Sequence, residues 1–166
     1  DGKNAAQYYN QVVRMSPPYE MEFNARIKRA RLYDSESENG GQIKRGLLKM
    51  LKDEKNQEYL DQIYYTLAEI EEKEKNIPQA VEYLKLSVKT SVSNTNQKAL
   101  SFLKLADISF FKPDYKLAEA YYDSTMIFLN KDYADYELIS EKKKSLTELV
   151  SNLNIISLED SLQALS

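Results

Sequence analysis

The sequence predicts an all-α fold, in which helical hairpins repeat and a capping helix follows the last of them. One observation is composition: 166 residues include only 4 Gly and 4 Pro, while Lys, Glu, Leu, Ala and Gln are common. Such a composition favours long helices over a sheet with many turns. The other observation is a local pattern that occurs twice at a fixed offset. With 42% hydrophobic residues, the chain can bury the core of one globular domain.

The repeated pattern pairs a small residue on one helix with a small residue on the next. The first copy contains Ala68 and Ala80, and the second contains Ala106 and Ala118, each 38 residues further on. Small residues let two helix backbones approach, and a larger apolar residue four positions later fills the space beside them. The remaining matched positions are Tyr64, Leu67, Leu84 and Ser87 in one copy and Phe102, Leu105, Tyr122 and Thr125 in the other. The pattern therefore predicts two equivalent helical hairpins.

The first hairpin is expected to join helices over 58–74 and 78–92, with Pro78 at the start of the second helix. The second hairpin is expected over 97–111 and 114–130. Between the hairpins, residues 90–94 either lengthen the helix before them or form a loop.

These hairpins resemble the tetratricopeptide repeat family, whose 34-residue unit places small residues at its eighth and twentieth positions. The resemblance implies a right-handed superhelical stack in a single domain, with well-matched repeats at 56–94 and 95–131. It also implies that 1–17 is the second helix of a truncated repeat and that 18–55 is a degenerate repeat. In the degenerate repeat, Gly46 falls at the small position of the second helix.

Residues 134–166 are expected to form capping helices, because a repeat stack must cover its last apolar face. The main helix is expected over 136–154. A shorter amphipathic piece is expected after it, with Ser157 and Asp160 as a capping box. Its leucines at 158, 162 and 165 share one stripe, which suggests a continuation or a partner.

The residues that are missing exclude most catalytic chemistry. The chain has no Cys, His or Trp, so it offers no thiolate nucleophile, imidazole base or usual zinc site. The acids over 69–74 are expected on an open helical face, where no burial would raise a carboxyl pKa. We therefore expect a non-enzyme with no catalytic residue, cofactor or metal. A net charge of −3 also argues against nucleic acid as a partner.

The family resemblance assigns a concave, protein-binding groove to one face of the first helices. Tyr65 and Phe111 are its members most expected to be exposed. An alternative is that the apolar members simply pack between repeats or under the capping helix. The chain lacks the lysine and asparagine with which some repeats of this family grip a terminal carboxylate. The groove positions are Asn24, Ile27, Arg31, Gln62, Tyr65, Glu69, Glu72, Lys73, Leu100, Leu103, Asp107, Phe110 and Phe111.

Basic residues gather over 26–31 and recur at Lys44 and Arg45. They would either meet an acidic partner or simply form a solvated helix face balanced by nearby acids.

Several segments are similar to tetratricopeptide lipoproteins of Bacteroidota that are associated with gliding motility and type IX secretion. These segments are 17–27, 59–65, 91–100, 136–139 and 158–165. The resemblance implies a scaffold on the periplasmic side of the outer membrane, whose partners are other proteins, including secretion or motility components. Any lipid anchor would lie outside this segment. A glycan-binding helical repeat protein and the sensor module of a regulator are the alternatives, and a chain without cysteine fits cytosol and periplasm equally.

Overall fold

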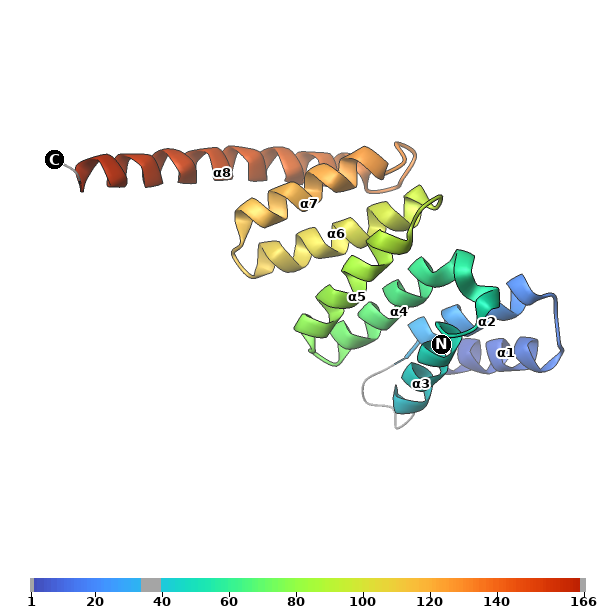
Figure 1. Cartoon of the computed structure of the whole chain (residues 1–166). Helices are drawn as coiled ribbons and strands as arrows, with labels where there is room; N and C mark the ends of the chain where they lie inside the picture. The colour runs from blue at the N-terminus through green and yellow to red at the C-terminus, as the bar shows by residue number, and fades with distance from the viewer. Residues whose placement is uncertain (1, 34–39, 165–166) are drawn as a thin grey trace. The chain divides into compact units, whose positions relative to one another are not determined.

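The computed structural model describes residues 2–33 and 40–164, and within these residues every regular element is a helix. The all-α prediction is therefore confirmed. The chain divides into two compact units, Asp1–Ser91 and Val92–Ser166, here named unit 1 and unit 2. Figure 1 shows the helices of each unit, which are described separately below.

Unit 1 contains two helical hairpins and a helix between them. Helices α1 and α2 form one hairpin, α4 and α5 form the other, and both α2 and α3 pack against α4. The elements are α1 (Gly2–Arg14), α2 (Tyr19–Arg31), α3 (Gly40–Met50), the 3-10 helix η1 (Glu54–Tyr59), α4 (Leu60–Lys73) and α5 (Ile77–Thr90). The core is made by Phe23, Ile27, Ala30, Tyr33, Leu47, Ile63, Leu67 and Ile70.

Unit 2 is one hairpin with a long helix packed against it. The hairpin joins α6 (Thr95–Phe111) to α7 (Tyr115–Phe128), and α8 (Tyr136–Gln163) packs against α7. Figure 1 shows α8 running along α7 and continuing past the end of the hairpin. The core is made by Ala99, Ala106, Ala118, Tyr122, Leu129, Ile139, Leu146 and Val150.

The two hairpins that the sequence pattern predicted are both present, as α4–α5 and α6–α7. Ala68, Ala80, Ala106 and Ala118 all have 0% of their surface exposed, as the close approach of paired helices requires. The hydrogen bonds at the hairpin turns follow the same spacing. Asn76 N–H donates to the Glu71 carbonyl at 2.8 Å, and 38 residues later Asp114 N–H donates to the Ser109 carbonyl at 3.0 Å. The repeat is therefore one of local geometry as well as sequence.

Several predicted helix limits need correction. Helix α4 begins at Leu60, because the preceding residues form η1. Helix α5 ends at Thr90, so residues 91–94 are a connection, and the Asn94 side chain accepts a hydrogen bond from Gln97 N–H at the start of α6. The predicted separate piece after residue 154 is wrong, since α8 is continuous to Gln163.

The degenerate repeat also differs from its expected form. Gly46 was expected where two helices touch, yet it is exposed and a Cβ atom placed on it would meet no atom within 4 Å. No backbone lies close enough to require glycine at this position. The expectation of a tight contact here is wrong.

The end of α4 leads to a stability prediction. Lys75 has φ of 61°, and its N–H donates to the Glu72 carbonyl at 3.0 Å, as in a helix terminus closed by a left-handed residue. Because glycine adopts this conformation without steric cost, Lys75→Gly should raise the free energy of unfolding of unit 1 by about 0.5–1 kcal/mol. Urea denaturation followed by circular dichroism measures this change. Lys75→Ala keeps the Cβ atom and is the control. Equal stability of the two variants would contradict the prediction.

Candidate protein-binding site

Four of the predicted groove residues of unit 1 come together where α2 lies beside α4. Arg31 Nε is 3.0 Å from Glu69 Oε2, and the Arg31 guanidinium lies 5.3 Å from the centre of the Tyr65 ring. Lys73 Nζ donates to the main-chain carbonyls of Arg31 at 2.7 Å and Tyr33 at 2.9 Å. These contacts tie α4 to the C-terminal end of α2.

Two predicted groove residues of unit 1 are buried. Tyr65 is only 7% exposed, and the guanidinium of Arg31 lies over its ring, so the expectation that Tyr65 is exposed is wrong. Ile27 belongs to the core of unit 1. Asn24 is exposed, and Gln62 and Glu72 are half-buried.

In unit 2, three of the five predicted groove positions, Leu103, Asp107 and Phe110, lie close to α8. Asp107 Oδ1 accepts a hydrogen bond from Tyr122 OH at 2.5 Å and another from Lys142 Nζ of α8 at 2.6 Å. Lys142 Nζ also lies 5.2 Å from the ring centres of both Phe110 and Tyr122. Leu103 packs against the core with Phe110. For these two apolar residues, packing under the capping helix is the correct alternative.

The other two groove positions of unit 2 differ in exposure. Leu100 is half-buried, whereas Phe111 is 80% exposed at the end of α6. The expected exposure of Phe111 is confirmed.

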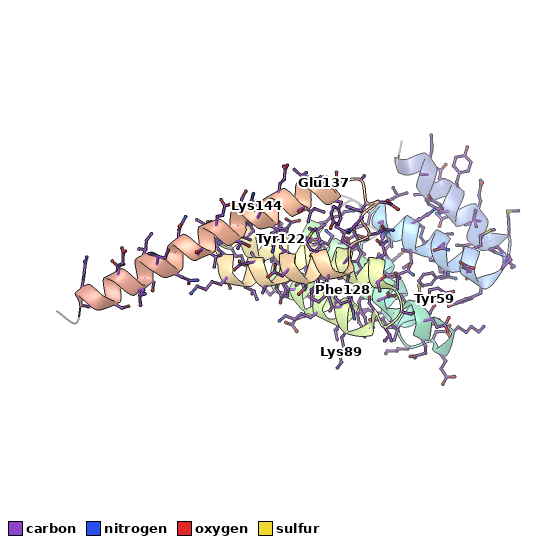
Figure 2. The ribbon with its side chains drawn as sticks, turned by 90° about the horizontal axis from the view of Figure 1, so that it is seen from above. Tyr59, Lys89, Tyr122, Phe128, Glu137 and Lys144 are labelled. Carbon is purple, nitrogen blue, oxygen red and sulfur yellow. The ribbon has the colours of Figure 1, made fainter. Side chains whose placement is uncertain are left out.

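The Asp107 cluster is an electrostatic clamp on α8. Burial raises the pKa of Tyr122, and the hydrogen bond to Asp107 and the charge of that carboxylate raise it further. Tyr122 therefore stays protonated as a donor at neutral pH. A cavity of about 170 Å³ adjoins the cluster and is bounded by Leu103, Leu138 and the paired Asp107 and Lys142. In Figure 2, Tyr122 lies beneath α8.

Most of the basic run is already paired within unit 1. Arg26 binds Glu22 at 2.6 Å, and Arg29 Nη1 donates to Asn10 Oδ1 at 2.6 Å. Lys44 binds Glu71 at 2.7 Å, and it also binds Glu74, at 2.8 Å. These internal pairs favour the interpretation of a balanced helix face over an acidic partner.

The acids of α4 are not all on an open face, contrary to expectation. Glu71 is 3% exposed, and besides Lys44 it accepts a hydrogen bond from the Asn76 side chain at 2.7 Å. Glu71 therefore has a structural role, since it links α4 to Lys44 of α3 and to Asn76 in the turn that follows α4. In the described part of the chain, no group of three or more metal-ligating side chains lies together.

An apolar surface outside the predicted groove lies at the far end of α8, where the sequence predicted a stripe of leucines. Every described side chain from residue 151 to 161 is exposed. Figure 2 shows the side chains of these turns standing clear of the rest of unit 2. The sequence does contain a signal for this long helix: residues 136–163 include neither Gly nor Pro, which favours one continuous helix. From residue 149 onward, the large apolar side chains exposed on α8 are Leu149, Leu153, Ile155, Ile156 and Leu158.

Three of these side chains form a row, here named the α8 row: Leu149, Leu153 and Ile156. Their i, i+4 and i+7 spacing places them along one side of the helix. This side borders the face that packs on the hairpin through Ile139, Leu146 and Val150. The α8 row is therefore an exposed apolar surface beside the face of α8 that packs on the hairpin.

Comparison with known proteins gives no family for this chain. No family model matches its sequence, and no curated protein matches it. Among the described residues, no helix is long and apolar enough to cross a membrane.

Proposed function

We propose that this chain is a non-catalytic scaffold that holds other proteins. The observation that carries the proposal is the α8 row, which exposes apolar surface beside the face that already packs against helices of unit 2. Contiguous exposed apolar side chains are typical of protein interaction sites. The occupant we propose is a helix of a partner protein. In its first half, α8 already packs against helices of the hairpin, and the α8 row lies beside that packing face.

The α8 row would supply part of the free energy with which a partner binds. Complete burial of a leucine or isoleucine side chain contributes about 1.5–3 kcal/mol, and the members of the α8 row are already 38–53% exposed. Covering the exposed part of each would contribute about 1 kcal/mol. The clamp on Lys142 holds the inner half of α8 in place, so a partner need not order this helix when it binds.

The resemblance to tetratricopeptide lipoproteins supports a narrower proposal. On that basis the scaffold belongs to a repeat stack at the cell envelope, and its partners are components of protein secretion or gliding motility. The sequence segments quoted above are the support for this assignment. The paired charges of unit 1 and the Asp107 clamp of unit 2 are consistent with a structural, non-catalytic role.

The test compares two double variants of α8. Leu153→Glu with Ile156→Glu places acids in the α8 row, whereas Ile155→Glu with Leu158→Glu makes the same change on the opposite side of the helix. All four positions are exposed, so both variants should fold. A partner is first found by photo-crosslinking from position 153 in an envelope extract, and its affinity is then measured with purified proteins by calorimetry.

We expect the row variant to bind the purified partner more than about tenfold more weakly than the native chain does, because it loses apolar contact and buries charge. The opposite-side variant should stay within about threefold. Equal affinity of the row variant and the native chain would contradict a scaffold that works through this row.

A further inference from the structure

Unit 1 contains a hollow of about 620 Å³ between α2 and α3. Its apolar lining consists of Tyr19 and Met50, which are half-buried, and of Phe23, which is only 1% exposed. The Phe23 ring stacks on the Tyr59 ring with centres 4.4 Å apart. The Tyr19 hydroxyl donates to Asn56 Oδ1, and Asn56 Nδ2 donates to the Met50 carbonyl at 2.8 Å. These contacts hold the lining side chains in place.

Helix α3, which is held by α4, carries Gly46 on the side that lines the hollow. Leu47 of α3 belongs to the core of unit 1, and Lys44 pairs with Glu71 and Glu74. These contacts fix α3 from the α4 side. On the other side, Gly46 lines the hollow, and a Cβ atom there would meet nothing within 4 Å. A longer side chain at position 46 therefore has room to extend into the hollow.

The edge of the hollow has an excess of positive charge. Its lining includes three basic residues and two acidic ones. Arg26 is already paired with Glu22, and Asp53 caps η1 by accepting a hydrogen bond from Lys55 N–H at 3.1 Å. Lys49 and Lys52 are exposed and have no ion pair with any residue that the structure describes. Two cations are therefore available to a ligand.

We propose that this hollow binds a peptide segment of a partner protein that carries a large apolar side chain next to acidic residues. The apolar side chain would lie on the half-buried Tyr19 and Met50, and the carboxylates would face Lys49 and Lys52. An extended or helical segment fits better than a free small molecule, because five of the ten lining residues are charged, whereas small-molecule pockets are mostly apolar. The site lies in unit 1, so it is independent of the α8 row of unit 2.

The test uses a fluorescein-labelled peptide, Gly-Asp-Glu-Phe-Asp-Glu-Gly, and fluorescence anisotropy with the whole chain. Gly46→Leu grows a side chain into the hollow, while Gly46→Ala adds one methyl group and is the matched control. Both changes replace an exposed helical glycine, so both should stabilise the fold. We expect saturable binding that Gly46→Ala preserves within about twofold and Gly46→Leu weakens by about tenfold or more.

Charge is tested separately with Lys49→Gln and Lys52→Gln together. This double variant should bind the same peptide about tenfold more weakly, and its affinity should depend less on salt concentration. A peptide with Ala for Phe should also bind about tenfold more weakly.

Three results would overturn the proposal. One is the absence of saturable binding, and another is Gly46→Leu binding as tightly as the native chain. The third is 3-phenylpropionate binding as tightly as the peptide, which would make the hollow a small-molecule site. None of these results would bear on the proposal for the α8 row, and failure of that proposal would not bear on this site.

Discussion

Replacing Ala118 by aspartate should unfold unit 2. Ala118 is fully buried where α7 meets α6, and a carboxylate there would lie in the apolar core of unit 2. An uncompensated buried charge costs several kcal/mol, about 3–5 in measured cases, which is comparable to the whole stability of a small domain. Circular dichroism melting should lose the transition of unit 2. Hydrogen exchange should place the lost protection in α6 to α8.

The matched control for this prediction is Ala120→Asp. Ala120 lies on the same helix but is exposed, so its charge remains in water. This variant should change the free energy of unfolding by only about 0.5 kcal/mol. If Ala118→Asp melted like Ala120→Asp, the packing of the α6–α7 hairpin described here would be wrong. Ala106→Asp should reproduce the Ala118 result from the other helix, because Ala106 is equally buried.

The second large effect is expected at Tyr122. Its side chain is fully buried and its hydroxyl donates to Asp107. Tyr122→Ala should destabilise unit 2 by about 3–5 kcal/mol, because it removes an aromatic ring from the core and leaves a cavity. Tyr122→Phe keeps the ring and removes only the hydrogen bond to a carboxylate, which should cost about 1.5 kcal/mol.

Urea denaturation of the two variants separates the ring from the hydroxyl. The alanine variant should unfold at much lower urea than the phenylalanine variant, with hydrogen exchange again reporting on α6 to α8. Equal destabilisation by the two changes would show that the hydrogen bond, and not the packed ring, is the main contribution. That outcome would contradict the account of this core.

The hairpins could be predicted from the sequence because their determinants are local and repeated. The spacing from Ala68 to Ala80 recurs from Ala106 to Ala118, and each of these positions needs only a small residue facing one neighbouring helix. Such a requirement is visible in residue type and spacing. The buried state of all four alanines follows directly from it.

Other features depend on which helices meet, and residue spacing does not contain that information. Tyr65 is covered because α2 brings Arg31 over its ring, and Glu71 is buried because α3 places Lys44 beside it. Gly46 matched a template position for close packing, but in the folded chain α3 is held from the α4 side. Each error concerns a tertiary contact. For Tyr65 and Glu71, the helix that carries the residue was predicted nearly correctly.

The extent of α8 was missed for a different reason. The sequence after residue 154 contains Ser157 and Asp160, which match a helix start, but the same residues are compatible with a helix interior. Ser161 Oγ donates to the Ser157 carbonyl at 2.7 Å, one turn earlier, so these polar side chains are accommodated within the helix.

The length of α8 sets a distance at which a partner would be held. Val150 is the last buried residue among the side chains of this helix that the structure describes, and 13 residues continue from it to Gln163. At 1.5 Å per residue, these turns reach about 20 Å from the hairpin. The inner half is fastened by the Lys142 ion pair and by a second pair between Lys143 and Asp123 at 3.0 Å. The first half of α8 is therefore fixed to the hairpin, and the rest of the helix extends from it. A pulling force on a molecule bound near the C-terminal end of α8 would act on the ion pairs with Asp107 of α6 and Asp123 of α7.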